Sequence, residues 1–452
     1  MVTSQAISRL VEYYRKEGLD MHSLLVARSG VLVSETYWKP FGKDSMQRMY
    51  SCTKSLTAMA VLMLSHDGRL ALDDPIVRYF PEYVQGPVDP RLEATTIRDM
   101  LKMESCFRTT CYKRSQDPSW TRTFFTVEPD HEPGSFFSYD TGSYQVLASL
   151  VEKLSGQSLV SFLHDHLLHT YGFSEDAYCL KNAAGEAMGG SGLMAHSRDL
   201  LVVLQALTDP ACPYHKEFRE AVSKQVETAP GAAGGLLDLN QGYGYGFWRL
   251  SHDGWCMYGM GGQMAIYLPK QKLAVATTAW VKPVSGGLQT LFNGIWDLLL
   301  PSLKDEPLAE EPPLPLEPEL PFAKGKRPGT DWNGNWRMTS RTLGFDSLAV
   351  KTDASKLTIS FKTGTQTYVL EAGLGKNLVG PSVFHDGWTS ATSAAVDSDG
   401  NLQVHCRFLT PEVGLLALTL AKRGNRLSVR VQSWIEPKLP LANGSSSAIV
   451  QG

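Results

Sequence analysis

The chain of 452 residues lacks the features by which several functional classes are recognised. It carries 43 basic and 46 acidic residues, a formal net charge of -3, so it has no basic footprint for nucleic acid. Residues 1–20 contain no apolar core of an export signal, and no run is long and apolar enough to span a bilayer. We therefore expect a globular protein of the cytoplasm that binds neither nucleic acid nor a membrane.

Cysteine is also scarce, and its spacing matches no common metal site. The seven cysteines are odd in number and scattered, and they form neither a CxxC pair nor a zinc knuckle. Free thiols in a reducing compartment are the simplest explanation, although Cys106 and Cys111 are close enough in sequence to pair in an exported protein. We expect no metal and no organic cofactor.

The composition changes along the chain and predicts two domains, since 452 residues are too many for one ordinary core. Residues 1–303 combine helical periodicity with short strands. Residues 304–328 are rich in proline and glutamate, which is typical of a stiff, extended linker. Residues 329–436 alternate polar and apolar positions in short runs, which predicts an all-β barrel or sandwich. We expect a flexible tail over residues 437–452.

Within the first domain, strand signals lie at both ends and helix signals between them. Apolar residues at helical spacing precede Gly18, and a hairpin follows with its turn at residues 28–30. Residues 102–132 are irregular and indicate a loop or lid, and a helix is expected over 287–300. Later strands are predicted over residues 243–250, 254–258, 264–268 and 273–280. Together these segments predict a mixed α/β (α+β) fold, in which the hairpin joins the late strands in one antiparallel sheet, flanked by helices and interrupted by a mainly helical insertion.

The pattern with the clearest chemistry is Tyr50-Ser51-Cys52-Thr53-Lys54-Ser55, at the start of a long apolar segment. A segment that is apolar on every side predicts a helix buried inside a domain. Residues three apart share one face of a helix, so the Lys54 amine can reach the Ser51 hydroxyl. An ordinary helix-capping serine is the alternative, but it leaves a lysine in an apolar helix unexplained, because a buried ammonium is costly unless it is paired or used. Cys52 is a rival nucleophile, more simply interpreted as a core thiol.

Two later segments contain groups that suit the same chemistry. Tyr139 lies in a turn before a predicted helix, where its hydroxyl could project into a cleft; the alternative is a core tyrosine with a hydrogen-bonded hydroxyl. Residues 258–263 interrupt the late strands with three glycines. They indicate either a tight bend or a strand edge whose bare amides can approach an acyl oxygen.

Taken in this order, the segments resemble the serine β-lactamase and penicillin-binding-protein-like hydrolases. The resemblance is strongest to the class C-like branch with its esterases, D-aminopeptidases, acyltransferases and 6-aminohexanoate-dimer hydrolase. The family pattern is Ser-x-x-Lys, then Tyr-x-Asn, then a strand with Lys/His-x-Gly. The resemblance covers about residues 5 to 300 and includes framework stretches at 72–75, 96–101 and 189–193. It implies a β-lactamase-like fold for the first domain.

The resemblance also implies a role for each matching position. Ser51 would be the acylated nucleophile, Lys54 its base or proton relay, and Tyr139 a second base that also protonates the leaving group. A free tyrosine titrates at about pH 10, so Tyr139 would act as a phenolate only if a cation such as Lys54 lowered its pKa. The oxyanion hole would pair the Ser51 amide with the amide of Met260. The other oxyanion and substrate-binding candidates are Gly259, Gly261, Asp140 and Thr141.

Two positions depart from the family pattern and bear on the substrate. Thr141 stands where the family often has asparagine, so a side-chain amide that would help to bind an amide substrate is missing. Met257 stands where the family has lysine or histidine, a cation that helps to bind the substrate carboxylate. The second change argues against penicillin as the substrate and for a neutral or differently charged acyl compound.

The sequence therefore predicts a serine hydrolase that cleaves a small-molecule ester or amide through an acyl-Ser51 intermediate. An acyltransferase of the same fold is one alternative, because both enzymes share the first half-reaction. A catalytically silent binding protein is another, disfavoured by the retention of all three reactive side chains. A homo-oligomer and the role of the C-terminal domain are left open.

Overall fold

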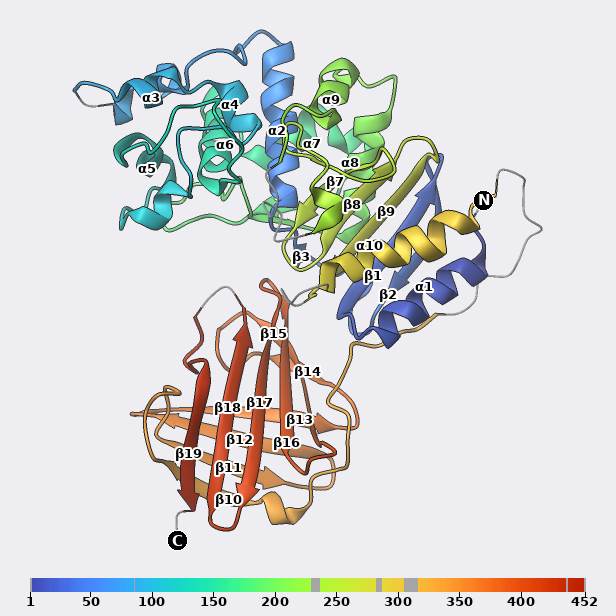
Figure 1. The fold of residues 1–452 in the computed structure, drawn as a ribbon, viewed down its shortest axis with the longest axis vertical. Helices are drawn as coiled ribbons and strands as arrows, with labels where there is room; N and C mark the ends of the chain where they lie inside the picture. Colours follow the sequence, from blue (N-terminus) through green and yellow to red (C-terminus); the bar gives the residue numbers. More distant parts are fainter. Residues whose placement is uncertain are drawn as a thin grey trace. The chain divides into compact units, whose positions relative to one another are not determined.

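The computed structural model describes residues 2–84, 86–228, 236–281, 287–304, 316–435 and 438–450. Contacts within the chain divide it into two compact units, Met1–Pro318 and Glu319–Gly452. Each unit has its own fold, and Figure 1 traces both by colour, from the blue N-terminus to the red C-terminus.

The first unit is built on an antiparallel sheet that joins the two ends of its sequence. Among the described residues the strand order is β2-β1-β9-β8-β7-β6. The strands are β1 (Met21–Arg28), β2 (Val31–Tyr37), β6 (Trp248–Arg249), β7 (Trp255–Gly259), β8 (Gln263–Leu268) and β9 (Leu273–Ala279). Strand β1 pairs with β9 along its whole length, so the blue hairpin lies beside the later strands in Figure 1. The predicted single sheet is confirmed.

Helices pack on this sheet because each has an apolar stripe. Helix α1 (Ser4–Lys16) places Tyr14 on its buried face, and the Tyr14 hydroxyl donates to the Leu291 carbonyl of α10 (Gly287–Gly294) at 2.9 Å. Figure 1 shows α1 and α10 crossing one face of the sheet. Helix α8 (Ser197–Thr208) contacts β1, β8 and β9. The helix predicted over 287–300 begins as α10 and continues as a π-helical turn over Ile295–Leu299.

The helical insertion is centred on α2 (Cys52–His66). Every residue from Cys52 to Leu64 is buried, as expected of a helix that is apolar on all sides, and α2 contacts α6, α7 and α9. A capping box of Thr96 and Asp99 begins helix α4 (Ile97–Leu101). The other helices of the insertion are α3 (Pro90–Ala94), α4 (Ile97–Leu101), α5 (Trp120–Thr126), α6 (Thr141–Ser155), α7 (Leu159–His166) and α9 (His215–Val222).

Three local elements differ from the expectations. The loop expected over 102–132 contains α5, which Ser119 caps. The strand expected over 243–250 is reduced to β6, because Gly242 and Gly246 adopt positive φ angles of 116° and 82° that interrupt an extended strand. A second small sheet, too short to show a periodic pattern, is formed by β3 (Gln47–Arg48), β4 (Tyr178–Cys179) and β5 (Leu193–Ala195).

The second unit is a barrel. Its described residues form ten strands in the order β13-β12-β11-β10-β19-β18-β17-β16-β15-β14. Parallel pairing of β13 with β15, at Gly373↔Ser393 and Leu374↔Ala394, closes the sheet, so the all-β prediction is confirmed as a barrel. The strands are β10 (Gly334–Met338), β11 (Ser347–Thr352), β12 (Lys356–Thr363), β13 (Gln366–Leu374), β14 (Leu378–Pro381), β15 (Thr389–Val396), β16 (Leu402–Thr410), β17 (Gly414–Arg423), β18 (Arg426–Trp434) and β19 (Gly444–Val450).

The expected flexible tail over residues 437–452 is wrong over Gly444–Val450. Gly444–Val450 forms β19, which pairs with both β10 and β18. Its first half is a run of glycine and serine with low strand propensity, so the strand depends on its neighbours rather than on local preference.

The second unit also begins earlier than the predicted residue 329. Ala323 is buried, and its N–H donates to Ser393 Oγ at 2.9 Å, so the segment from Glu319 belongs to the barrel unit. Of the linker predicted over residues 304–328, residues 305–315 lie outside the described part of the chain.

Among the described residues, no single helix has both the length and the apolar composition needed to cross a membrane. Helices α6 and α7, bent by 59° at their junction, meet that test only when taken together. Both helices bury most of their apolar residues within the first unit.

Candidate active site

Ser51 lies in the turn that leads into α2. Its backbone is near-helical, with φ of -68° and ψ of -5°, and in the described part of the chain its side chain makes no capping hydrogen bond. The hydroxyl instead lies 3.0 Å from Lys54 Nζ, one helical turn further along. The structure thus forms the predicted serine–lysine pair, and Ser51 is not an ordinary helix cap.

Lys54 is held deep in the unit by oxygen atoms from three segments. The residue is 1% exposed, and besides Ser51 its Nζ donates to the Gly190 carbonyl at 2.7 Å and to Thr141 Oγ1 at 3.2 Å. It also lies 4.9 Å from the centre of the Tyr139 ring. These partners offset the cost of burying an amine and fix its position beside the serine.

Tyr139 approaches the same serine from the turn before α6. Burial raises the pKa of the Tyr139 phenol well above its usual range, and a hydrogen bond with the Ser51 side chain offsets this only in part. The ring stacks on Trp248, with centroids 5.3 Å apart and planes 28° apart. Tyr139 therefore remains a neutral phenol at neutral pH, which disfavours the phenolate considered above.

The glycine-rich turn between β7 and β8 passes close to the nucleophile. A Cβ atom on Gly259 would lie only 2.3 Å from the Met49 carbonyl, so a residue without a side chain is needed for β7 to reach the turn before Ser51. Gly261 has a φ of +83° and accepts a hydrogen bond from Val281 N–H at 2.8 Å, which fixes the bend. Met260 lies between these glycines, and its role as the second oxyanion donor stays a prediction.

The structure separates the roles of Asp140 and Thr141. Asp140 is fully buried, and its carboxylate accepts hydrogen bonds from Gly142 N–H at 2.8 Å and from Ser143 N–H at 2.9 Å. It is the N-cap of α6, so the predicted substrate contact by Asp140 is corrected to a positioning role. Thr141, the next residue, is brought to Lys54 by this cap.

Sequence reasoning missed the contribution of Gly189 and Gly190 to the site. A Cβ on Gly189 would lie 2.0 Å from Ala148 Cβ, and one on Gly190 would lie 2.5 Å from Thr141 Cγ2. Without side chains, this segment packs against α6 and presents the Gly190 carbonyl to Lys54. The cluster of glycines over residues 189–192 was the available signal. Trp248, which supports Tyr139, had no comparable signal.

Cys52 is unsuited to be the nucleophile. It is fully buried, its thiol donates to the Gln263 carbonyl at 3.2 Å, and burial raises the pKa of the thiol. All seven cysteines lie in the described ranges, and each is a free thiol, so the alternative pairing of Cys106 with Cys111 is not formed.

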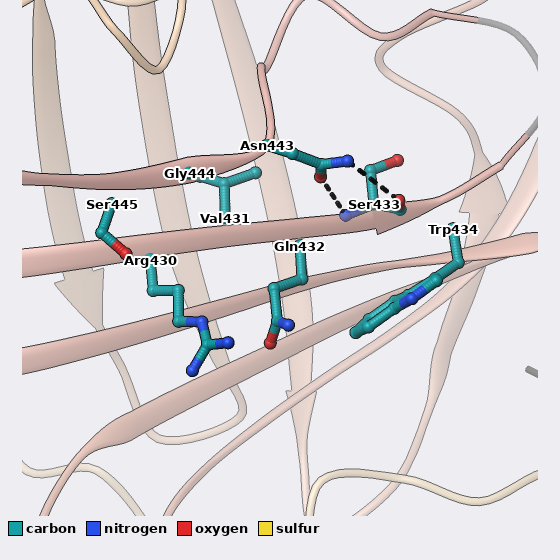
Figure 2. A pocket seen from close by; sticks show the side chains of 8 residues that line it. All are labelled: Arg430, Val431, Gln432, Ser433, Trp434, Asn443, Gly444 and Ser445. Atoms are coloured by element: carbon teal, nitrogen blue, oxygen red, sulfur yellow. Dashed lines mark hydrogen bonds between the residues drawn. The ribbon is translucent and has the colours of Figure 1, made fainter. Parts of the chain in front are cut away.

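A separate hollow of about 420 Å³ lies in the barrel unit, between β18 and the start of β19 (Figure 2). Figure 2 shows the Asn443 side chain beside Ser433, where its Oδ1 accepts from the Ser433 backbone N–H at 2.5 Å. Asn443 thereby replaces the strand pairing that β19 would supply there. The residues that line this hollow include no lysine or histidine beside Ser433 or Ser445, so it has no counterpart of the Ser51–Lys54 pair.

Residues 5–283 match the family model described as Beta-lactamase. The chain belongs to the Beta-lactamase family. Over 209 residues it is 25% identical to the 6-aminohexanoate-dimer hydrolase of Paenarthrobacter ureafaciens, an alignment that covers 41% of this chain and 52% of that relative. The chain spans between 36% and 52% of the length of the curated relatives it matches.

Two solved structures of similar fold extend the comparison. The octameric penicillin-binding protein homologue from Pyrococcus abyssi has a TM-score of 0.52 at 17% identity and covers 91% of this chain and 97% of its own. EstCE1, described as a hydrolase with promiscuous acyltransferase activity, has a TM-score of 0.52 at 17% identity and covers 65% of this chain and 99% of its own. The predicted family and its fold are therefore confirmed.

Proposed function

We propose that this chain is a serine hydrolase that cleaves a small ester or amide through an acyl-Ser51 intermediate. One observation carries the proposal: the buried Lys54 Nζ lies 3.0 Å from Ser51 Oγ and 4.9 Å from the centre of the Tyr139 ring. A nucleophile with proton-transfer groups in hydrogen-bond reach is what covalent acyl transfer requires. Membership of the Beta-lactamase family supports this assignment.

In the first half-reaction Lys54 acts as a free amine, with its two N–H groups directed to Gly190 and Thr141 and its lone pair toward Ser51. Ser51 Oγ attacks the acyl carbon while its proton passes to this lone pair. The backbone N–H groups of Ser51 and Met260 stabilise the oxyanion. When the bond to the leaving group breaks, the Tyr139 hydroxyl donates its proton to the leaving atom, and the Lys54 ammonium returns a proton to Tyr139. The raised pKa of Tyr139 suits this neutral relay.

In the second half-reaction, water attacks the acyl carbon and the same groups run in reverse. Tyr139 takes the water proton and passes one to Lys54, which then protonates Ser51 Oγ as the acid product leaves. The free amine and the free hydroxyl are restored, so the cycle needs no further reactant.

The substrate we propose has a neutral acyl group. Met257, at the position of the family's strand cation, is fully buried and cannot pair with a carboxylate. Thr141 Oγ1 accepts a hydrogen bond from Lys54, and its side chain offers no amide to a substrate. Tyr139 and Trp248 add aromatic rings beside the serine. Short linear amides belong in the test set, because a related sequence is named for hydrolysis of a 6-aminohexanoate dimer.

An acyltransferase is the second candidate. EstCE1, which is similar in fold, is described as a hydrolase with promiscuous acyltransferase activity. Transfer and hydrolysis share acyl-Ser51 and differ only in whether an alcohol, an amine or water accepts the acyl group. Adding a primary alcohol during ester turnover separates the two, since a transferase forms a new ester in place of the acid.

The test is a substrate panel read by product and by intact mass. We expect turnover of p-nitrophenyl esters or short linear amides, little turnover of nitrocefin, and a fluorophosphonate adduct on Ser51. A chain that forms no adduct and turns over no member of the panel would instead be the silent binding protein.

A further inference from the structure

The residue before the nucleophile has an uncommon backbone conformation. Tyr50 has a φ of +45°, in the left-handed region that bulky residues rarely occupy. Such a conformation persists only when the surrounding structure holds it in place. Tyr50 is 2% exposed, and its carbonyl accepts a hydrogen bond from Thr53 Oγ1 at 2.6 Å. This turn sets the direction in which the Ser51 side chain points.

Arg48 holds the same turn through the Tyr50 side chain. Its guanidinium carbon lies 4.7 Å from the centre of the Tyr50 ring, a cation–π contact. Its Nε donates to the Ser191 carbonyl at 2.9 Å, and its Nη2 lies 3.4 Å from Ser191 Oγ. Arg48 is 4% exposed, so these contacts are shielded from water and from salt.

Ser191 directly follows the residue that orients the base. The Gly190 carbonyl accepts a hydrogen bond from Lys54 Nζ at 2.7 Å, so a shift of Ser191 also moves a partner of the amine. Arg48 and Ser191 are 143 residues apart in sequence. One side chain therefore ties the strained turn before the nucleophile to the segment that holds the base.

We propose that Arg48 is a positioning residue that sets the geometry of the Ser51–Lys54 pair through the Tyr50 ring and the Ser191 carbonyl. The inference rests on the proposed function of that pair. Arginine suits the task because its planar guanidinium stacks on a ring and donates to a carbonyl at the same time, whereas lysine offers only a point charge. Without Arg48 the turn before Ser51 relaxes. A small displacement of the reacting atoms then lowers turnover, although every reacting group is present.

The experiment compares kcat and KM for p-nitrophenyl ester hydrolysis by the full chain and its variants. In Arg48→Met we expect kcat to fall by about 10- to 100-fold with KM nearly unchanged. Arg48→Lys should recover part of this loss, because it keeps a cation over the Tyr50 ring. Tyr50→Leu should also lower kcat, and the double variant Arg48→Met/Tyr50→Leu should lose much less than the product of the two separate losses.

Arg98→Met is the matched control. Arg98 donates to Asp73 Oδ1 at 2.7 Å and to the Tyr245 hydroxyl at 2.6 Å, so its loss removes arginine contacts that involve neither the Tyr50 ring nor Ser191. We expect a lower melting temperature and an unchanged kcat. An equal fall of kcat in Arg98→Met and Arg48→Met would overturn the positioning role, because the effect would then be a general loss of stability.

The activity and structure of the Arg48 variants also test the positioning role. A folded Arg48→Met with wild-type kcat overturns the proposal, and if that variant does not fold, Arg48→Lys with wild-type kcat overturns it. A crystal structure of the folded variant gives a readout independent of activity: Ser51 Oγ and Lys54 Nζ should lie beyond hydrogen-bond distance, and an unchanged pair would contradict us. Absence of any Ser51 adduct in the wild-type chain would contradict the proposed function. The crystal structure of the Arg48→Met variant would still test whether Arg48 positions Ser51 and Lys54.

Discussion

The barrel and the serine-bearing insertion bury their side chains on different principles. The interior cluster of the barrel is made of apolar residues, among them Trp336, Ile359 and Leu418. The insertion instead buries Lys54 and Asp140, each held by several short hydrogen bonds. Apolar contacts are individually weak and interchangeable, whereas a buried polar network works only when every partner is in place. Function should therefore be sensitive to single changes in the insertion, and stability should be spread widely in the barrel.

Removal of the nucleophile should have the largest effect on activity with the smallest effect on stability. Ser51→Ala should lower turnover on the order of 10⁴-fold or more, because no acyl-enzyme can form, while the melting temperature changes little. Steady-state kinetics and intact mass after fluorophosphonate treatment measure both parts. Cys52→Ala is the matched control, since its buried thiol donates to the Gln263 carbonyl and not to Ser51 or Lys54, and it should keep most of the activity. A dead Cys52→Ala beside an active Ser51→Ala would refute the mechanism.

Removal of a proton-transfer group should have the next largest effect. Lys54→Met and Tyr139→Phe should each slow acylation by about 10²- to 10⁴-fold, and the double variant should be little worse than either, because both act on one proton path. Pre-steady-state bursts of p-nitrophenol measure the acylation rate. Near-normal acylation in Tyr139→Phe would remove that residue from the mechanism.

The environment of Tyr139 predicts how acylation depends on pH. A free tyrosine ionises at about pH 10. Because burial raises the pKa of Tyr139, its active phenol form persists to higher pH. The ratio of wild-type to Tyr139→Phe acylation rates should stay flat up to about pH 10 and fall only above it. A decline that starts near neutral pH would show that the phenol ionises early.

On the barrel side, deletion of residues 443–452 should cost stability rather than chemistry. It removes β19 with the fully buried Ala448, and it leaves β10 and β18 without their common neighbour. We expect loss of a large part of the about 5–15 kcal/mol typical of a domain, seen as an earlier denaturant transition of the barrel. Fluorophosphonate labelling of Ser51 should persist. An unchanged transition would mean that β19 is dispensable.

The smallest contrast uses one glycine from each unit. Gly189→Ala forces a Cβ to within 2.0 Å of Ala148 Cβ, so we expect a loss of about 1–3 kcal/mol and reduced activity through the adjoining Gly190 carbonyl. Gly380→Ala in β14 meets no described atom within 4 Å and should change stability by less than about 0.5 kcal/mol. Urea unfolding measures both variants. Equal losses would show that packing at Gly189 is as tolerant as at the barrel surface.

The regular elements were largely predictable because their signals are local. Helix α2 follows from its apolar run, α4 from the capping box at Thr96, and the barrel strands from their period of two. Strand β19 was missed because its run of glycine and serine has little preference for a strand. The strands of the small sheet, two or three residues long, were missed because so short a segment has no period.

Sequence by itself determined which groups could react: a serine and a lysine one helical turn apart, a tyrosine, and a glycine-rich strand end. It also determined that no cation stands at position 257. The tertiary structure alone decided that Lys54 meets a carbonyl 136 residues away, that Asp140 caps α6 instead of facing a substrate, and that Arg48 spans Tyr50 and Ser191. The contacts of Lys54 and Arg48 join segments that are far apart in sequence, where a cationic side chain meets a backbone carbonyl or an aromatic ring, and no local periodicity encodes such contacts.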